Sequence, residues 1–360
     1  MKLFTCSKCK QTVFFENVRC TRCGSTLAYL PDPAVMSAME PRDGRLAALA
    51  PVAQNDLYSL CRNSVEHGVC NWAVPSKENE EYCRGCRLNG SLPDLSRSGA
   101  LQAWGSIERA KKRLLYTLFE LGLPVVSQRE KEGGLVFTFE ASGPAGPPVL
   151  TGHDHGHITL NMAEASTPLR EKLREDLGES YRTVLGHFRH EIGHYYWDAL
   201  IRDTDRLASF RDLFGDPDMD YGAELQRHYD KGPPPDWESA FVTRYATMHP
   251  WEDWAETWAH YLHIADTLGT ARSYGVALRP EPSGSSHSPK DLSVTVRRLD
   301  LECFDDLMNA WFPLTFALNS LNRGMGLSDL YPFVLSEPAI GKLRFVHDVI
   351  EQVGVRSQSV

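Results

Sequence analysis

The chain has 360 residues, of which 42% are hydrophobic and 24% are charged, so its composition is that of a globular protein able to bury a large core. Its formal net charge of −9 disfavours general binding to nucleic acid, because phosphate groups require a surplus of Lys and Arg. The first residues, MKLFTCSKCK, lack the apolar stretch of a secretion signal, and no apolar run reaches the ~18 residues of a membrane span. We therefore expect a cytoplasmic protein with two or three folding units and no membrane segment.

Cysteines dominate the N-terminal part of the chain. Eight of the nine cysteines lie within the first 86 residues, and six of these form CxxC pairs. Without a secretion signal, this spacing favours metal binding over disulfides or a redox dithiol. The first block has the spacing of a zinc ribbon, in which each CxxC turn presents two thiolates to one tetrahedral zinc. Its four predicted ligands are Cys6, Cys9, Cys20 and Cys23. We predict that residues 1–30 form this ribbon, with Gly24 relieving the crowded backbone after the last ligand.

A second cysteine block follows, with one CxxC pair and two scattered cysteines. Its predicted zinc ligands are Cys61, Cys70, Cys83 and Cys86. His67 could replace one of the cysteines, because imidazole is also a zinc ligand. We place this module within residues 31–95 and expect the stretch Pro31–Pro51 to be a linker or a partly helical strap. The two modules would hold one or two structural zinc ions and could recognise a protein partner.

Residues 96–360 alternate between helical and strand periodicity, which predicts a mainly helical domain with a small sheet and an α+β protein overall. A strand is expected over 135–140, and residues 148–152 and 157–161 are expected to form a hairpin. The helical segments are expected at residues 100–122, 168–202, 251–268, 304–321 and 339–353. Pro280–Pro289 reads as a linker. The isolated Cys303 is expected in the core.

One helical segment contains the residues His190-Glu191-Ile-Gly193-His194. Positions four apart lie on the same face of an α-helix, so the two imidazoles can reach one zinc ion. Glu191 then lies beside the metal and could take a proton from a zinc-bound water. Gly193 leaves room for another element to pack closely. The alternative is an amphipathic helix with two core histidines, but it does not explain a carboxylate on a strongly aromatic helix.

A catalytic zinc needs a third protein ligand and an open position. The segment from Trp251 to His260 carries Glu252 and Glu256 on one helical face among three tryptophans. Two buried carboxylates repel each other unless a cation or a donor satisfies them. A zinc ion for one and the free N–H of a ligand histidine for the other would satisfy both. The spacing alone leaves open which glutamate is the ligand.

The sequence LGHFRHEIGHYYWD, the WEDWAETWAHYLH segment and the two cysteine blocks resemble a bacterial family of zinc metallopeptidases with an N-terminal zinc ribbon. The pattern is similar to the glutamate-type zincins, in which a carboxylate is the third zinc ligand. The resemblance implies that Glu252 is the ligand and that Glu256 supports a ligand histidine. Related toxin-like zincins place an oxyanion-stabilising tyrosine seven residues before the ligand, which implies this role for Tyr245.

From these features we expect a zinc-dependent metallopeptidase that hydrolyses peptide bonds by Glu191-assisted attack of zinc-bound water. Its substrate would be a protein or a peptide, and its cofactors would be one catalytic and one or two structural zinc ions. The alternative is a zinc-ribbon adaptor that binds protein or nucleic acid and carries a catalytically silent zincin fold. A purely structural site does not need a general base, and the presence of Glu191 therefore favours the enzyme.

Overall fold

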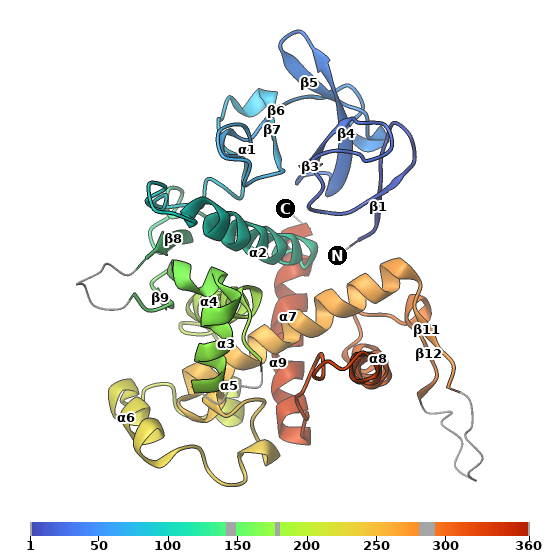
Figure 1. Ribbon diagram of the computed structural model, residues 1–360. Helices are drawn as coiled ribbons and strands as arrows, with labels where there is room; N and C mark the ends of the chain where they lie inside the picture. Colours follow the sequence, from blue (N-terminus) through green and yellow to red (C-terminus); the bar gives the residue numbers. More distant parts are fainter. Residues whose placement is uncertain (1, 142–148, 177–180, 281–291, 359–360) are drawn as a thin grey trace. The chain divides into compact units, whose positions relative to one another are not determined.

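The computed structural model describes residues 2–141, 149–176, 181–280 and 292–358, which belong to two compact units (Figure 1). Unit 1 comprises Met1–Phe119 and Val125–Arg170, and unit 2 comprises Glu120–Pro124 and Glu171–Val360. The α+β class with a mainly helical C-terminal part is confirmed.

Unit 1 contains most of the strands. They are β1 (Phe4–Thr5), β2 (Thr12–Val13), β3 (Thr26–Leu30), β4 (Val35–Arg42), β5 (Arg45–Ala48), β6 (Leu57–Leu60), β7 (Ala73–Pro75), β8 (Val136–Glu140), β9 (Gly152–Asp154) and β10 (His157–Asn161). Its helices include α1 (Arg62–Val65), α2 (Ala100–Glu120) and the first part of α3 (Thr167–Asp176). Strands β3 to β7 form an antiparallel meander in sequence order. A bridge between Tyr29 and Trp72 joins its first strand to the start of its last.

The expected linker or helical strap at Pro31–Pro51 is wrong, because this stretch forms β4 and β5. Met36, Ala38 and Met39 on β4 are buried, and Met39 belongs to the small core that also contains Ala28 and Tyr58. Ala and Met have a weak intrinsic preference for strands, so the composition does not indicate one. Pairing with β3 and β5 decides the structure here, and this pairing is a tertiary effect.

Helix α2 and a three-stranded sheet complete unit 1. The apolar stripe predicted for the helix is buried at Trp104, Ile107, Leu114 and Leu118. In the sheet, β10 pairs in parallel with β8 and antiparallel with β9. A hairpin is therefore present in this region, but its first strand is Gly152–Asp154 instead of 148–152, and residue 148 lies outside the described residues.

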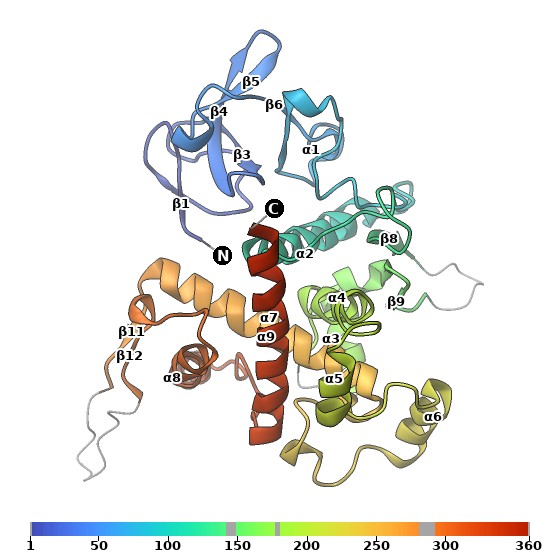
Figure 2. The same cartoon turned by 180° about the vertical axis from the view of Figure 1, so that it is seen from behind.

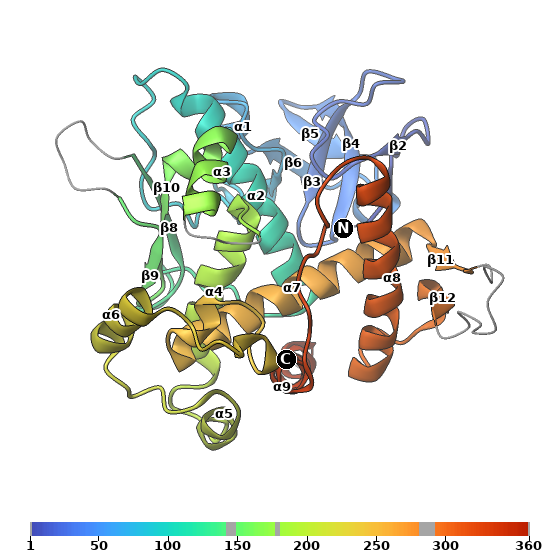
Figure 3. The ribbon, with the colours of Figure 1, turned by 60° about the horizontal axis from the view of Figure 1, so that its bottom comes forward.

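Unit 2 is built from helices around α7. Its elements are α4 (Val184–Leu200), α5 (Leu207–Phe214), α6 (Tyr221–Lys231), α7 (Pro250–Tyr274), β11 (Ala277–Leu278), β12 (Val294–Thr295), α8 (Phe304–Gly324) and α9 (Glu337–Gln358). Helix α9 crosses α7 (Figure 2), while α5 and α6 lie near the first half of α7 (Figure 3). None of the helices in the described part of the chain combines the length and the apolarity that a bilayer crossing requires.

The pair α4 and α7 forms the centre of unit 2. Gly193 of α4 faces Ala255 and Trp258 of α7, and the Trp254 Nε1–H donates a hydrogen bond of 2.8 Å to the Gly193 carbonyl oxygen. A Cβ atom at position 193 would lie 3.0 Å from Ala255 Cα and 3.2 Å from Trp258 Cβ. The absence of a side chain at Gly193 therefore allows the two helices to approach this closely.

Helix α9 contacts α7 at two places. Lys342 lies 2.6 Å from Asp253 in a buried ion pair at the start of α7. Further along, the Tyr261 hydroxyl hydrogen-bonds His347 Nδ1 at 2.9 Å.

The predicted core position of Cys303 is wrong, because this residue is exposed at the N-terminal boundary of α8. Most of the expected linker Pro280–Pro289 lies outside the described residues.

We predict that Gly193→Val lowers the free energy of unfolding by about 1 to 3 kcal/mol, because the added methyl groups overpack the contact with Ala255. Gly269→Ala on α7 is the matched control, since a Cβ there meets no atom within 4 Å. In a helix interior this change should stabilise by about 0.5 to 1 kcal/mol. Urea denaturation at equal metal content measures both effects. A stability of Gly193→Val equal to wild type would contradict the close-contact account.

Candidate metal centres

Helix α4 begins at a well-formed N-cap. Thr183 has extended backbone geometry, and its hydroxyl accepts a hydrogen bond of 2.9 Å from the Gly186 N–H. From this start, regular α-helix continues to Leu200. His190 and His194 therefore lie one turn apart on the same face, as their spacing predicts, and their ring centroids are 4.8 Å apart.

Helix α7 also begins in a way that its sequence explains. His249 Nδ1 accepts a hydrogen bond from the Trp251 N–H, and Pro250 occupies the first helical position, where the missing N–H costs nothing. Glu252 and Asp253 then fall in the first turn, where the positive end of the helix dipole favours carboxylates. This boundary places the Glu252 side chain beside α4.

Three side-chain atoms from these two helices converge. His190 Nε2 lies 3.0 Å from Glu252 Oε2, His194 Nε2 lies 3.5 Å from the same oxygen, and the two nitrogens are 3.2 Å apart. Ligands at the Zn–N and Zn–O distances of ~2.0–2.1 Å in a tetrahedron are about 3.3 Å from one another. The separations in this cluster therefore match three corners of a zinc tetrahedron.

The chemistry of Glu252 also fits a cation. Oxygen Oε2 is buried, and among the described residues no donor makes a hydrogen bond of good geometry to it. Burial disfavours the charged form, but the neighbouring His194 and His190 outweigh this effect and lower the pKa of Glu252. A buried, ionised carboxylate of this kind is stabilised by a bound cation.

Glu256 lies one turn further along α7 and occupies a different position. Its Oε1 lies 2.6 Å from Nδ1 of His190, on the side of the ring opposite Nε2. Burial raises the pKa of Glu256, but the hydrogen bond and charge of His190 outweigh this effect and lower it. The structure thus distinguishes the two glutamates, which the sequence spacing alone does not. Glu252 faces the Nε2 atoms of His190 and His194, whereas Glu256 faces Nδ1 of His190.

Glu191 follows His190 on α4 and is buried. Burial raises the pKa of its carboxyl group, and the neighbouring His190 and His194 only partly oppose this effect. Among the described residues, Glu191 is not in the group of three converging ligand atoms. Its position next to that group and its raised pKa suit a proton acceptor.

Aromatic side chains surround the cluster. The Trp251 ring packs on the His194 ring at 3.8 Å between centroids, and the Tyr245 ring lies 5.9 Å from the His190 ring. Tyr221, at the start of α6, donates a hydrogen bond of 2.9 Å from its hydroxyl to Glu252 Oε1. Sequence reasoning missed Tyr221, because it lies 31 positions before Glu252 in an exposed helix and no local motif marks it.

The first cysteine cluster lies in unit 1. Two of its sulfur pairs, Cys6 with Cys23 and Cys9 with Cys20, are separated by 3.7 and 3.6 Å. Four thiolates around zinc at ~2.3 Å are about 3.8 Å apart, so the cluster has the dimensions of a tetrahedral site. Gly24 adopts φ +71°, and its N–H donates to the Cys20 carbonyl oxygen, as expected for the turn after the last ligand.

The second cysteine cluster is more deeply buried than the first. Its sulfur atoms belong to Cys61, Cys70, Cys83 and Cys86, and all four residues are buried. The sulfurs of Cys70 and Cys83 are 3.6 Å apart, which again fits a tetrahedral zinc site. His67 is not a member of this group and packs against the Trp104 ring instead. The four cysteines form the cluster, and the alternative with a histidine is not needed.

Comparison with known proteins finds two zinc-binding families in this chain. Residues 3–97 match a zinc-ribbon domain family, and residues 100–349 match the family described as "putative zinc-binding metallo-peptidase". Uncharacterized proteins of Mycobacterium bovis and Mycobacterium tuberculosis are each 42% identical over 355 residues, covering 98% of this chain and 96% of theirs. No solved structure is significantly similar. The chain therefore belongs to the zinc-binding metallo-peptidase family and carries its N-terminal zinc-ribbon region.

Proposed function

We propose that the protein is a zinc-dependent peptidase in which His190, His194 and Glu252 hold the catalytic metal and Glu191 is the general base. The observation that carries this proposal is the convergence of two imidazole nitrogens and one carboxylate oxygen at 3.0, 3.2 and 3.5 Å. Three protein ligands leave one position for water or substrate, which is typical of catalytic zinc sites.

The reaction would be hydrolysis of a peptide bond in a protein or peptide substrate. When bound, zinc would supply a Lewis acid that polarises the scissile carbonyl and lowers the pKa of the attacking water. The Glu191 carboxylate takes the proton from this water and delivers it to the leaving amine. Burial raises the pKa of Glu191 above that of an exposed glutamate, which makes the carboxylate a stronger base.

Glu256 supports the site through His190. The His190 Nδ1–H donates a hydrogen bond to Glu256, which fixes the ring orientation and leaves the Nε2 lone pair directed toward Glu252 and His194. In this proposal Glu252 is the ligand and Glu256 holds a ligand in place.

Tyr245 and Tyr221 have different roles in this proposal. We assign Tyr245 to hydrogen bonding with the oxyanion of the tetrahedral intermediate, and Tyr221 to holding Glu252 through its 2.9 Å hydrogen bond. Tyr245→Phe should therefore lower kcat by up to roughly 100-fold with unchanged zinc affinity. Tyr221→Phe should weaken zinc binding instead. Steady-state kinetics and zinc titration on both variants test the division, and the reverse pattern would exchange the two roles.

The zinc-ribbon region would contact the substrate protein or a partner protein. The acidic net charge of −9 disfavours nucleic acid as this partner. Salt-dependent binding of the full chain to DNA or RNA would contradict this assignment, since such binding depends on neutralising phosphates.

Glu191→Gln should reduce hydrolysis by about 100- to 10,000-fold while the zinc content stays that of wild type, because an amide cannot accept the water proton. The measurement is proteome-wide identification of new protein termini after expression of each form. The exposed Glu238→Gln is the control and should behave as wild type.

Identical new termini from wild type and Glu191→Gln would show that another group is the base. If neither wild type nor Glu191→Gln produced new termini, the result would favour the adaptor with a catalytically silent fold over the peptidase.

Glu252→Ala and Glu256→Ala should differ in zinc content. Loss of the ligand removes one zinc ion per chain, whereas loss of the residue behind His190 weakens zinc binding by about 10- to 100-fold. Elemental analysis after dialysis against a range of chelator concentrations separates the two outcomes. If Glu256→Ala lost the metal and Glu252→Ala retained it, the assignment of the two glutamates would be wrong.

A further inference from the structure

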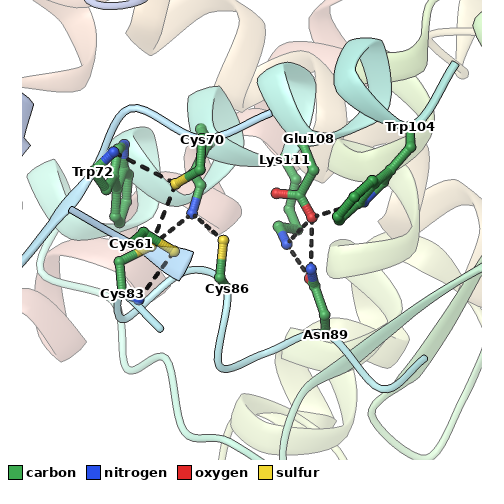
Figure 4. A network of polar contacts seen from close by, with 10 residues as sticks. Cys61, Cys70, Trp72, Cys83, Cys86, Asn89, Trp104, Glu108 and Lys111 are labelled. Carbon is green, nitrogen blue, oxygen red and sulfur yellow. Dashed lines mark hydrogen bonds and ion pairs between the residues drawn. The ribbon is translucent and has the colours of Figure 1, made fainter. Parts of the chain in front are cut away.

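A buried lysine of helix α2 contacts the second cysteine cluster. Lys112 Nζ lies 3.1 Å from the Cys83 sulfur and 3.3 Å from the Cys86 sulfur. The lysine is buried, with only 3% of the residue exposed. Figure 4 shows the cysteines of this cluster beside α2. A lysine amine so close to two metal-ligand sulfurs requires a physical explanation, because a buried charge is costly unless it is paired.

An aromatic ring and a glycine lie beside the ammonium group of Lys112. Its Nζ lies 4.4 Å from the centre of the Trp72 ring, within cation–π range. Gly85, between the two cysteines of the CxxC turn, lies directly beside it. A Cβ atom at Gly85 would come within 2.7 Å of Lys112 Nζ. The absence of a side chain at this position leaves the space that the ammonium group occupies.

Hydrogen-bond donors are distributed over all four sulfurs of the cluster. The Trp72 N–H donates to the Cys70 sulfur and the Cys83 N–H donates to the Cys61 sulfur, both at 3.4 Å. For Cys83 and Cys86, no backbone N–H within the described ranges donates to the sulfur. Lys112 Nζ donates hydrogen bonds to these two sulfurs.

The neighbouring lysine on α2 has a different partner. Lys111 lies 2.8 Å from Glu108 and also contacts Asn89, and all three side chains are buried (Figure 4). In contrast, no carboxylate in the part of the chain that the structure describes lies within ion-pair distance of Lys112. The anionic partners of Lys112 are therefore the cysteine thiolates.

We propose that Lys112 is a positioning residue of the Cys61–Cys70–Cys83–Cys86 zinc centre, which donates hydrogen bonds to the Cys83 and Cys86 thiolates and attaches helix α2 to the metal site. Four thiolates and one Zn²⁺ carry a net charge of −2, and the ammonium group reduces it to −1. The hydrogen bonds also stabilise the sulfur lone pairs, so the zinc is retained more strongly. This proposal is independent of the hydrolytic function.

The test uses the full-length zinc-loaded protein and iodoacetamide alkylation in the presence of a chelator, with each cysteine followed by mass spectrometry. In Lys112→Met, the cysteines of the second cluster should be alkylated about 10- to 100-fold faster than in wild type. The cysteines of the first cluster, Cys6, Cys9, Cys20 and Cys23, provide an internal control and should react at the wild-type rate.

Lys111→Met is the matched control, because it removes a buried lysine one position earlier on the same helix without touching a thiolate. Alkylation of the second cluster in this variant should stay at the wild-type rate. If Lys112→Met also reacted at the wild-type rate, the proposal would be overturned. The same conclusion would follow if Lys111→Met accelerated alkylation of the second cluster as much as Lys112→Met.

A spectroscopic measurement separates electrostatic positioning from packing. In the Co²⁺-substituted protein, loss of the N–H···S bonds in Lys112→Met should move the sulfur-to-metal charge-transfer bands to longer wavelength, and Lys111→Met should leave them unchanged. Unshifted bands in Lys112→Met would contradict the proposal.

If Lys112→Met does not fold, Gly85→Ala is a second test, because the added Cβ would displace the ammonium group of Lys112. It should then accelerate alkylation of the second cluster, and an unchanged rate would overturn the proposal.

Discussion

Helices α4 and α7 are in close contact where Gly193 meets Ala255, and the geometry of the candidate catalytic centre depends on this contact. His190 and His194 lie on either side of Gly193 in the sequence, and Glu252 precedes Ala255 by less than one turn. A larger residue at position 193 would push the helices apart and separate the imidazole nitrogens from the carboxylate. The Trp254 hydrogen bond to the Gly193 carbonyl oxygen and the Arg189 ion pair with Asp266 hold the same two helices together.

The parts of the site that depend on local periodicity could be predicted from the sequence. An α-helix places positions 190 and 194 on one face whatever surrounds it, and CxxC turns bring pairs of thiolates together in the same way. Residue spacing could not distinguish Glu252 from Glu256, because both lie on the same face of α7. The distinction comes from the packing of α7 on α4, which directs one carboxylate to both Nε2 atoms and the other to Nδ1 of His190.

Contacts between residues far apart in the chain could not be predicted. The stretch Pro31–Pro51 forms strands only because β3 and β5 pair with it, and its own residues have little preference for that structure. Tyr221 reaches Glu252, and Lys112 reaches Cys83, across separations of 31 and 29 residues. Neither residue belongs to a recognisable motif. In both cases a polar group on a helix distant in the sequence donates a hydrogen bond to a side chain of a candidate metal site.

We expect a zinc ion to bind between α4 and α7. The most direct measurement is an anomalous difference map from crystals of the protein, recorded at the zinc absorption edge. We expect a peak about 2.0 to 2.2 Å from His190 Nε2, His194 Nε2 and Glu252 Oε2, in addition to peaks at the two cysteine clusters. Peaks at the cysteine clusters without one between the two histidines and Glu252 would show that zinc does not bind between α4 and α7.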